Sequence, residues 1–131
     1  MALSFVISHR KNNLHPEKNS QYFLKLVQNE NIDLDHICKE IEKESSLTAP
    51  DIYAVAVALQ NKIMEHLEKG NSVNLEHLGK FSMGAKAKAY EDKTQITAKS
   101  VIKFHINYQP STKIKKWLKQ GFALKKVRKS E

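Results

Sequence analysis

The stretch Ser-Val-Asn-Leu-Glu-His-Leu-Gly-Lys-Phe, residues 72–81, carries most of what this sequence predicts about the fold. Val73 and Leu75 alternate with polar residues, as one buried face of a strand requires. Leu78 and Phe81 flank Gly79, and a glycine inside a strand usually marks a bulge or a close approach of another backbone. We therefore expect a short strand, a turn, and a second strand that begins near Gly79.

Two helices are predicted before this stretch. In residues 33–44 the apolar positions recur at i, i+3, i+4 and i+7 and form one stripe, which contains Cys38. A second helix should begin after Thr48 as N-cap, with Pro50 in its first turn and Asp51 near a capping-box position. It should run to Lys69, because Gly70 follows where a helix commonly ends.

The second helix contains an unbroken run of apolar and aromatic residues over positions 52–59. A helix that is apolar all round has to be covered on more than one side. With only one other well-formed helix before it, an intertwined homodimer is the simplest way to cover it. The alternative is a central helix in the core of a monomer.

Strands are expected on both sides of these helices. Residues 3–9 and 22–27 predict an N-terminal hairpin, joined by a polar loop over residues 10–20. After Phe81 a basic hairpin should turn at residues 91–93 and return from 94–97, with a short helical turn starting at Thr97 or Ser100 before the next strand, 103–108. Alternation places Phe104, Ile106 and Tyr108 inward, so we expect Phe81 and Phe104 to be buried. Residues 112–120 predict a short basic helix.

The charge of the chain is divided unevenly. The 131 residues carry a net charge of +8. Residues 1–81 hold nine Lys/Arg against eleven Asp/Glu, a balance of −2, whereas residues 82–131 hold thirteen against three, a balance of +10. Such asymmetry favours a polyanionic partner for the C-terminal part, although a lysine-rich surface also serves solubility.

Twelve of the thirteen cations in residues 82–131 are lysines, which suit phosphate contact better than the bidentate reading of bases. They are expected on the outer side of the hairpin and on the last helix. The predicted DNA-binding residues are Lys86, Lys88, Lys103, Lys113, Lys115 and Lys116.

Nothing in the sequence indicates an enzyme. The six histidines lie at no metal-ligand spacing, and there is no phosphate-binding glycine loop or nucleophile motif. We expect no cofactor, no metal and no small-molecule substrate. Cys38 is expected to be a buried structural thiol. One cysteine, no long apolar span and no secretory signal at the start predict a cytoplasmic chain without a membrane contact.

Residues 33–119 resemble the bacterial histone-like DNA-binding proteins of the HU/IHF family. The resemblance lies in Thr48 and Asp51, in Gly70, and in the order of the segments 78–81 and 104–111. It implies an α+β fold: an intertwined dimer with two helices under a small antiparallel sheet and a short C-terminal helix. The residues before 33 look like the extra N-terminal hairpin of a longer branch of these proteins.

The resemblance also implies binding of double-stranded DNA through phosphates and the minor groove, with little sequence reading. Residues 82–103 depart from the family pattern, because they contain no arginine and no proline and their turn is acidic at Glu91 and Asp92. These departures are compatible with phosphate binding and argue against sharp kinking of the duplex.

Together these observations predict a dimeric, nucleoid-associated DNA-binding protein with an architectural role. The expected parts are an N-terminal hairpin extension over residues 1–30, an HU-like domain over 31–120 and a basic tail over 121–131. The alternative is a dimeric protein-interaction module that has lost DNA bending or binding. RNA is a further possible polyanion.

Overall fold

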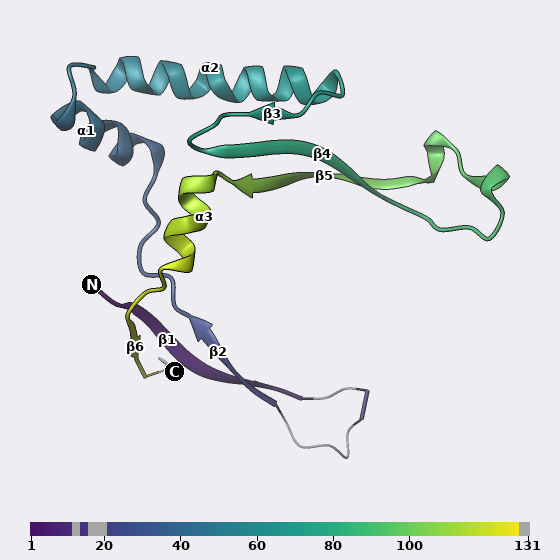
Figure 1. The fold of residues 1–131 in the computed structure, drawn as a ribbon, viewed down its shortest axis with the longest axis horizontal. Helices are drawn as coiled ribbons and strands as arrows, with labels where there is room; N and C mark the ends of the chain where they lie inside the picture. Colours follow the sequence, from purple (N-terminus) through teal and green to yellow (C-terminus); the bar gives the residue numbers. More distant parts are fainter. Residues whose placement is uncertain (12–13, 16–20, 129–131) are drawn as a thin grey trace. The chain divides into compact units, whose positions relative to one another are not determined.

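Two antiparallel helices form the first part of the chain's larger unit, residues 34–119 (Figure 1). The computed structural model describes residues 1–11, 14–15 and 21–128. Helix α1 covers Leu34–Glu44 and α2 covers Ala49–Glu68, and the two helices pack against each other. Both predicted helices are therefore confirmed, as is the burial of Cys38, which is 1% exposed.

The capping residues explain where α2 begins and ends. The Thr48 hydroxyl accepts a hydrogen bond from the Asp51 backbone N–H at 3.3 Å and donates one to the Asp51 carboxylate at 2.7 Å. The first bond occupies a backbone N–H that the first turn of a helix leaves without an intrahelical partner, and the second fixes the Thr48 hydroxyl in the capping position. Gly70 follows the last residues of the helix with a φ of 86°, a left-handed conformation that glycine adopts without steric cost.

A three-stranded antiparallel sheet follows, in the order β3-β4-β5. Its strands are β3 (Val73–Asn74), β4 (Gly79–Ala87) and β5 (Val101–Pro110). Helix α2 contacts β3 and β4, and helix α3 (Thr112–Lys119) contacts β5. The predicted strands around residues 72–81 and 103–108 and the predicted last helix are thus confirmed.

Gly79 lies at a close approach between β4 and β5, as its position in the sequence predicts. A Cβ atom there would meet the backbone oxygen of Gln109 and come within 2.7 Å of the Tyr108 ring. The Tyr108 hydroxyl in turn donates a hydrogen bond of 2.7 Å to the Leu78 carbonyl. Only a glycine lets the two strands approach so closely at the start of β4.

The distal end of the β4–β5 hairpin holds two short 3-10 helices, η1 (Lys93–Gln95) and η2 (Ala98–Ser100). The expected return over residues 94–97 as extended chain is wrong. The Asp92 carboxylate accepts from the Thr94 N–H and starts η1 instead. The predicted helical turn near Thr97 is confirmed, since the Thr97 N–H donates to Ser100 Oγ at 3.0 Å and the Ser100 N–H to the Thr97 carbonyl at 2.9 Å.

The apolar core of the described chain is small. Cys38 and Leu67 are its buried hydrophobic residues, at 1% and 3% exposure. Phe81 is partly buried, but the expectation that Phe104 is buried is wrong, because Phe104 is 64% exposed. The physical reason is that α2 contacts β3 and β4, while the β4–β5 hairpin extends beyond α2 (Figure 1).

The second unit comprises residues 1–33 and 120–131. Its described strands are β1 (Leu3–Arg10), β2 (Gln21–Leu26) and β6 (Leu124–Lys126), in the order β2-β1-β6. The predicted N-terminal hairpin is confirmed by the antiparallel pairing of β1 and β2. Most of its expected loop, residues 12–13 and 16–20, lies outside the described residues. Strand β6 pairs with β1 in parallel and was not predicted.

Candidate nucleic-acid interface

The β4–β5 hairpin has one polar face and one apolar face. Its register pairs Lys80 with Gln109 and Lys86 with Lys103, and alternation along each strand puts these pairs on the same side. Side chains on this polar face carry positive charge or hydrogen-bonding groups. They are Lys80, Ser82 and Lys86 from β4 and Lys103, His105, Asn107 and Gln109 from β5.

Lys86 and Lys103 lie directly opposite each other across the two strands. Two ammonium groups at such a pair of positions repel each other and destabilise the hairpin. Both side chains are solvent-exposed, and no ion pair to either is found among the described residues. An anion placed between the two lysines would relieve the repulsion, and a phosphate group has the required charge.

Gly84 lies between Ser82 and Lys86 on the same face, opposite His105. A Cβ atom at Gly84 would meet the His105 imidazole, with Cε1 at 2.8 Å, and the Asn107 amide nitrogen at 2.9 Å. The His105 ring therefore lies over the glycine backbone. Because Gly84 has no side chain, the polar groups of β5 can lie across β4 in the middle of the polar face.

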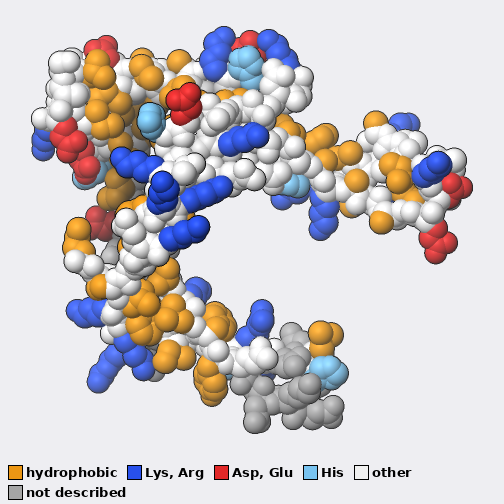
Figure 2. Space-filling view, viewed as in Figure 1, with side chains coloured by type: hydrophobic (Ala, Val, Ile, Leu, Met, Phe, Trp, Pro, Cys, Tyr) orange, Lys and Arg blue, Asp and Glu red, His pale blue; other side chains and the backbone are white. Residues whose placement is uncertain are grey.

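Helix α3 carries its lysines on one half of its surface. At 100° per residue, Lys113, Lys115, Lys116 and Lys119 occupy a continuous arc. The opposite arc contains Ile114, which is partly buried, and α3 contacts β5. The helix starts at the buried Ser111, whose hydroxyl accepts from the Ile114 N–H at 3.3 Å. Figure 2 shows Lys and Arg side chains gathered over the region of α3.

The distal end of the hairpin carries two carboxylates, Glu91 and Asp92, beside the cations Lys93 and Lys99. The Thr94 N–H donates to an Asp92 carboxylate oxygen at 3.0 Å, and this hydrogen bond lowers the pKa of Asp92. Asp92 is therefore ionised near neutral pH, next to Glu91 in the sequence. The carboxylates offset the charge of Lys93 and Lys99, so this end lacks the uncompensated positive charge that Lys86 and Lys103 give the polar face.

The structure brings some of the predicted lysines together and places others apart. Lys86 and Lys103 are register partners, and Lys88 follows directly after β4, where its N–H donates to the Ser100 carbonyl. The other three predicted lysines are exposed on α3, a separate element that follows β5. Lys80 also lies on the polar face and was not predicted. The spacing of Lys80, Ser82, Gly84 and Lys86 is the signal that could have identified it.

The other face of the hairpin is apolar and largely uncovered in one chain. Phe81 and Tyr108 pack together with ring centroids 5.2 Å apart. Further along, Met83, Ile106 and Phe104 are 45%, 56% and 64% exposed. An exposed row of large apolar side chains on a strand pair usually marks an interaction surface.

Neither a metal site nor a membrane-spanning helix is found in the part of the chain that the structure describes. That part has no group of three or more His, Cys, Asp or Glu side chains that could hold a metal ion. None of its helices combines the length and apolar character needed to cross a bilayer.

The chain is similar to known proteins in two comparisons. A family model described as "HU domain fused to wHTH, Ig, or Glycine-rich motif" matches residues 1–126. A crystal structure from Bacteroides vulgatus ATCC 8482, described as that of a candidate bacterial DNA-binding protein, matches with a TM-score of 0.68 and 12% identity. The match covers 98% of this chain and 50% of that one, so the chain spans half the length of the solved structure. No curated protein matches the chain.

Proposed function

Because the chain belongs to the family of HU domains fused to wHTH, Ig or glycine-rich motifs, we propose that it binds double-stranded DNA with little sequence preference. In this proposal it acts without catalysis, as a dimeric architectural protein of the bacterial nucleoid. The HU-like domain, assigned to residues 31–120, makes the contacts. The residues that we propose to contact DNA phosphates are Lys86, Lys88, Lys103, Lys113, Lys115 and Lys116.

The observation that carries this proposal is the pairing of Lys86 with Lys103 on a polar hairpin face. Two facing ammonium groups are unfavourable in the free protein and favourable around a phosphate. Lysine contacts to phosphates fix the protein on the duplex but carry no base information. Such an interface therefore predicts affinity that depends strongly on salt and weakly on DNA sequence.

The exposed apolar surface supports the dimer in this proposal. On α2, Tyr53 and Val55 are 51% and 58% exposed, although they belong to the apolar run of the helix. Phe104 and Ile106 are exposed on the apolar face of the hairpin. A chain with so small a core gains stability when a second copy covers these side chains.

Strong kinking of DNA is not part of the proposed function. Sharp kinks by minor-groove proteins usually require an apolar wedge between base steps together with close backbone contact. Residues 82–103 contain no proline or arginine, and the distal end of the hairpin carries Glu91 and Asp92. The protein should therefore bend DNA less than family members whose ribbons end in an intercalating proline.

A fluorescence anisotropy titration with labelled duplex DNA at low and high salt tests the proposal. If about six lysines engage per site, log K should fall with log salt at a slope of about −5. Scrambling the DNA sequence should change the affinity little. Replacing Lys86 and Lys88 by Gln should flatten the slope by about two.

The matched control replaces Lys39 and Lys43 of α1 by Gln, which removes the same charge outside the proposed interface and should leave the slope unchanged. No binding at low salt would favour the alternative of a dimeric protein-interaction module. A strong preference for one sequence would contradict the phosphate-based mechanism.

A further inference from the structure

Strand β1 of the smaller unit is paired along most of its length on one side only. On the β2 side the register runs without a gap from Phe5 to Arg10. On the β6 side it covers Leu3, Ser4 and Phe5 and then stops. The part of β1 after Phe5 therefore presents a sheet edge that no other described strand occupies.

The hydrogen-bond pattern shows which backbone groups this edge offers. Ser4 bonds toward β2, since its carbonyl accepts from the Val27 N–H at 2.8 Å. Phe5 bonds toward β6, since its carbonyl accepts from the Val127 N–H at 2.9 Å. Because neighbouring residues alternate, the N–H and C=O groups of Ile7 and His9 face the β6 side. None of the described residues pairs with them there.

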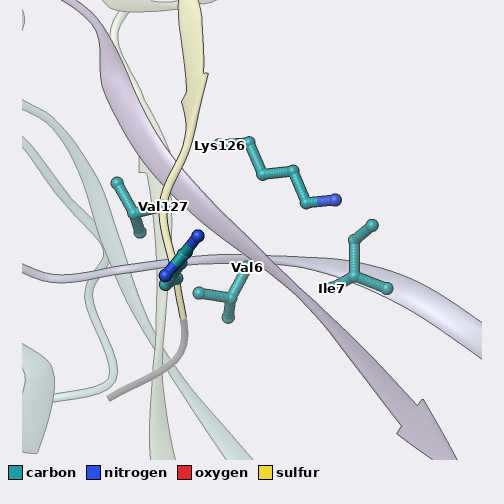
Figure 3. A pocket seen from close by; sticks show the side chains of 5 residues that line it. Val6, Ile7, Lys126 and Val127 are labelled. Atoms are coloured by element: carbon teal, nitrogen blue, oxygen red, sulfur yellow. The ribbon is translucent and has the colours of Figure 1, made fainter.

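A hollow lies beside this open edge (Figure 3). It has a volume of about 650 Å³, and it is lined by Val6, Ile7, Lys126, Val127 and Arg128. In Figure 3 the Ile7 and Lys126 side chains extend to the same side of the ribbon, next to each other. The hollow thus offers apolar surface from three branched side chains and positive charge from two cations.

The chemistry of the edge selects a polypeptide over a nucleic acid. Ile7 and His9 offer alternating donors and acceptors, which an extended peptide backbone complements and which phosphate groups, having acceptors alone, do not. The cations around the edge, Lys126 and Arg128 with Arg10 at the end of β1, favour acidic side chains. They also disfavour a second copy of this edge, because two copies would bring the same cations together.

We propose that the open edge of β1 over residues 6–10, with Lys126 and Arg128, binds an extended acidic peptide segment of a partner protein by strand addition. The backbone of the peptide pairs with Ile7 and His9. Its alternate side chains contact Ile7 on one face of the sheet and Val6 on the other, and its carboxylates approach Lys126 and Arg128. This site lies in the smaller unit and does not depend on DNA binding by the larger one.

Fluorescence anisotropy with a labelled heptapeptide tests the proposal, using a peptide in which aspartate or glutamate alternates with isoleucine or valine. The full chain should bind this peptide. Two control peptides should bind at least tenfold more weakly. One has lysine in place of the acidic residues, and the other has alternate backbone amides N-methylated. Equal binding of the N-methylated peptide would overturn the strand-addition mechanism.

Two variants, one of them a proline substitution, test the edge separately from the rest of the sheet. Ile7→Pro removes the N–H that faces the open side together with the isoleucine side chain that lines the hollow, and proline is tolerated at such an edge position. It should abolish peptide binding and leave the β1–β2 amide signals in NMR spectra unchanged. Arg128→Glu, beyond the last strand, should weaken binding at least tenfold with the fold intact. Unchanged binding by either folded variant, or displacement of the peptide by duplex DNA, would refute the proposed site.

Discussion

The two sheets of this chain are both three-stranded, but they use their apolar and polar sides differently. In the sheet β3-β4-β5 the β4–β5 register extends over nine residue pairs, and one face of this hairpin collects lysines. In the sheet β2-β1-β6 the third strand contributes three pairs and leaves the rest of β1 open. The first sheet therefore presents a charged face, and the second presents an edge.

This difference follows from what covers each sheet. Helix α2 lies against β3 and β4, and its last turn contributes the buried Leu67. No helix belongs to the smaller unit among its described residues, and its apolar side chains Leu3, Leu24 and Leu124 are 44%, 49% and 50% exposed. The larger unit is thus the place where stability and assembly should be sensitive to mutation.

The largest expected effect is on assembly through the larger unit. Val55→Asp places a charge on an exposed apolar position of α2 that the proposed dimer would bury. Sedimentation at micromolar concentration should give about twice the 15.0 kDa chain mass for the unchanged protein and a loss of the dimer for this variant. The matched variant Leu124→Asp in the smaller unit should remain dimeric. A well-folded monomer of the unchanged chain would contradict the intertwined dimer.

The next effect concerns packing. Leu67→Ala should lower the free energy of unfolding by about 2–5 kcal/mol, because Leu67 is 3% exposed and its truncation leaves a cavity. Leu124→Ala, at a half-exposed position, should cost less than about 1 kcal/mol. Urea denaturation measures both costs, followed by the helical circular dichroism signal for the larger unit and by the β1–β2 amide signals in NMR spectra for the smaller one. Equal costs would show that the larger unit is not better packed than the smaller one.

On the polar face of the hairpin we expect a smaller effect on stability, and one of opposite sign, because the substitution should stabilise the free protein. Lys103→Gln removes one member of the facing pair with Lys86, so it should raise the stability of the free protein by about 0.2–1 kcal/mol. The same change should weaken DNA binding, since a phosphate loses one of its two lysines. Thermal unfolding and anisotropy titrations of one preparation test both parts. A variant that is less stable and binds DNA unchanged would remove the reason to place phosphate between these lysines.

The sequence predicted the larger unit well because its signals are local. Caps at Thr48 and Gly70, alternation around Gly79 and the periodicity of α3 each act within a few residues. Strand β6 escaped prediction because it pairs with β1 over more than a hundred residues of chain, and its three residues carry no pattern of their own. Phe104 was misjudged because alternation shows which side chains share a face but not whether another layer covers that face.

The same limits applied to the candidate interface. Net charge and alternation identified Lys86 and Lys103 individually, but only the register shows that they face each other. The open edge of β1 could not be foreseen at all, since it depends on where the unpredicted β6 ends. Contacts distant in the sequence thus decide both surfaces, while local patterns decide the elements that carry them.

The smallest expected effect is a pH dependence of the free energy of unfolding, caused by Glu65 near the end of α2. Hydrogen bonds from Lys62 at 3.0 Å and Lys69 at 3.3 Å lower the pKa of Glu65 below its ordinary value of 4.5. The contribution of the Glu65 carboxylate to stability is therefore present above pH 4.5. It is lost as the pH falls through the lowered pKa of Glu65 in the folded protein. Glu65→Gln should reduce stability slightly at pH 7, and the difference from the unchanged protein should be smaller at pH 3. Because Glu65 is solvent-exposed, salt should diminish the difference at pH 7. Urea denaturation at both pH values and two salt concentrations measures it. A difference that persisted undiminished at low pH would show that Glu65 acts through packing rather than through its charge.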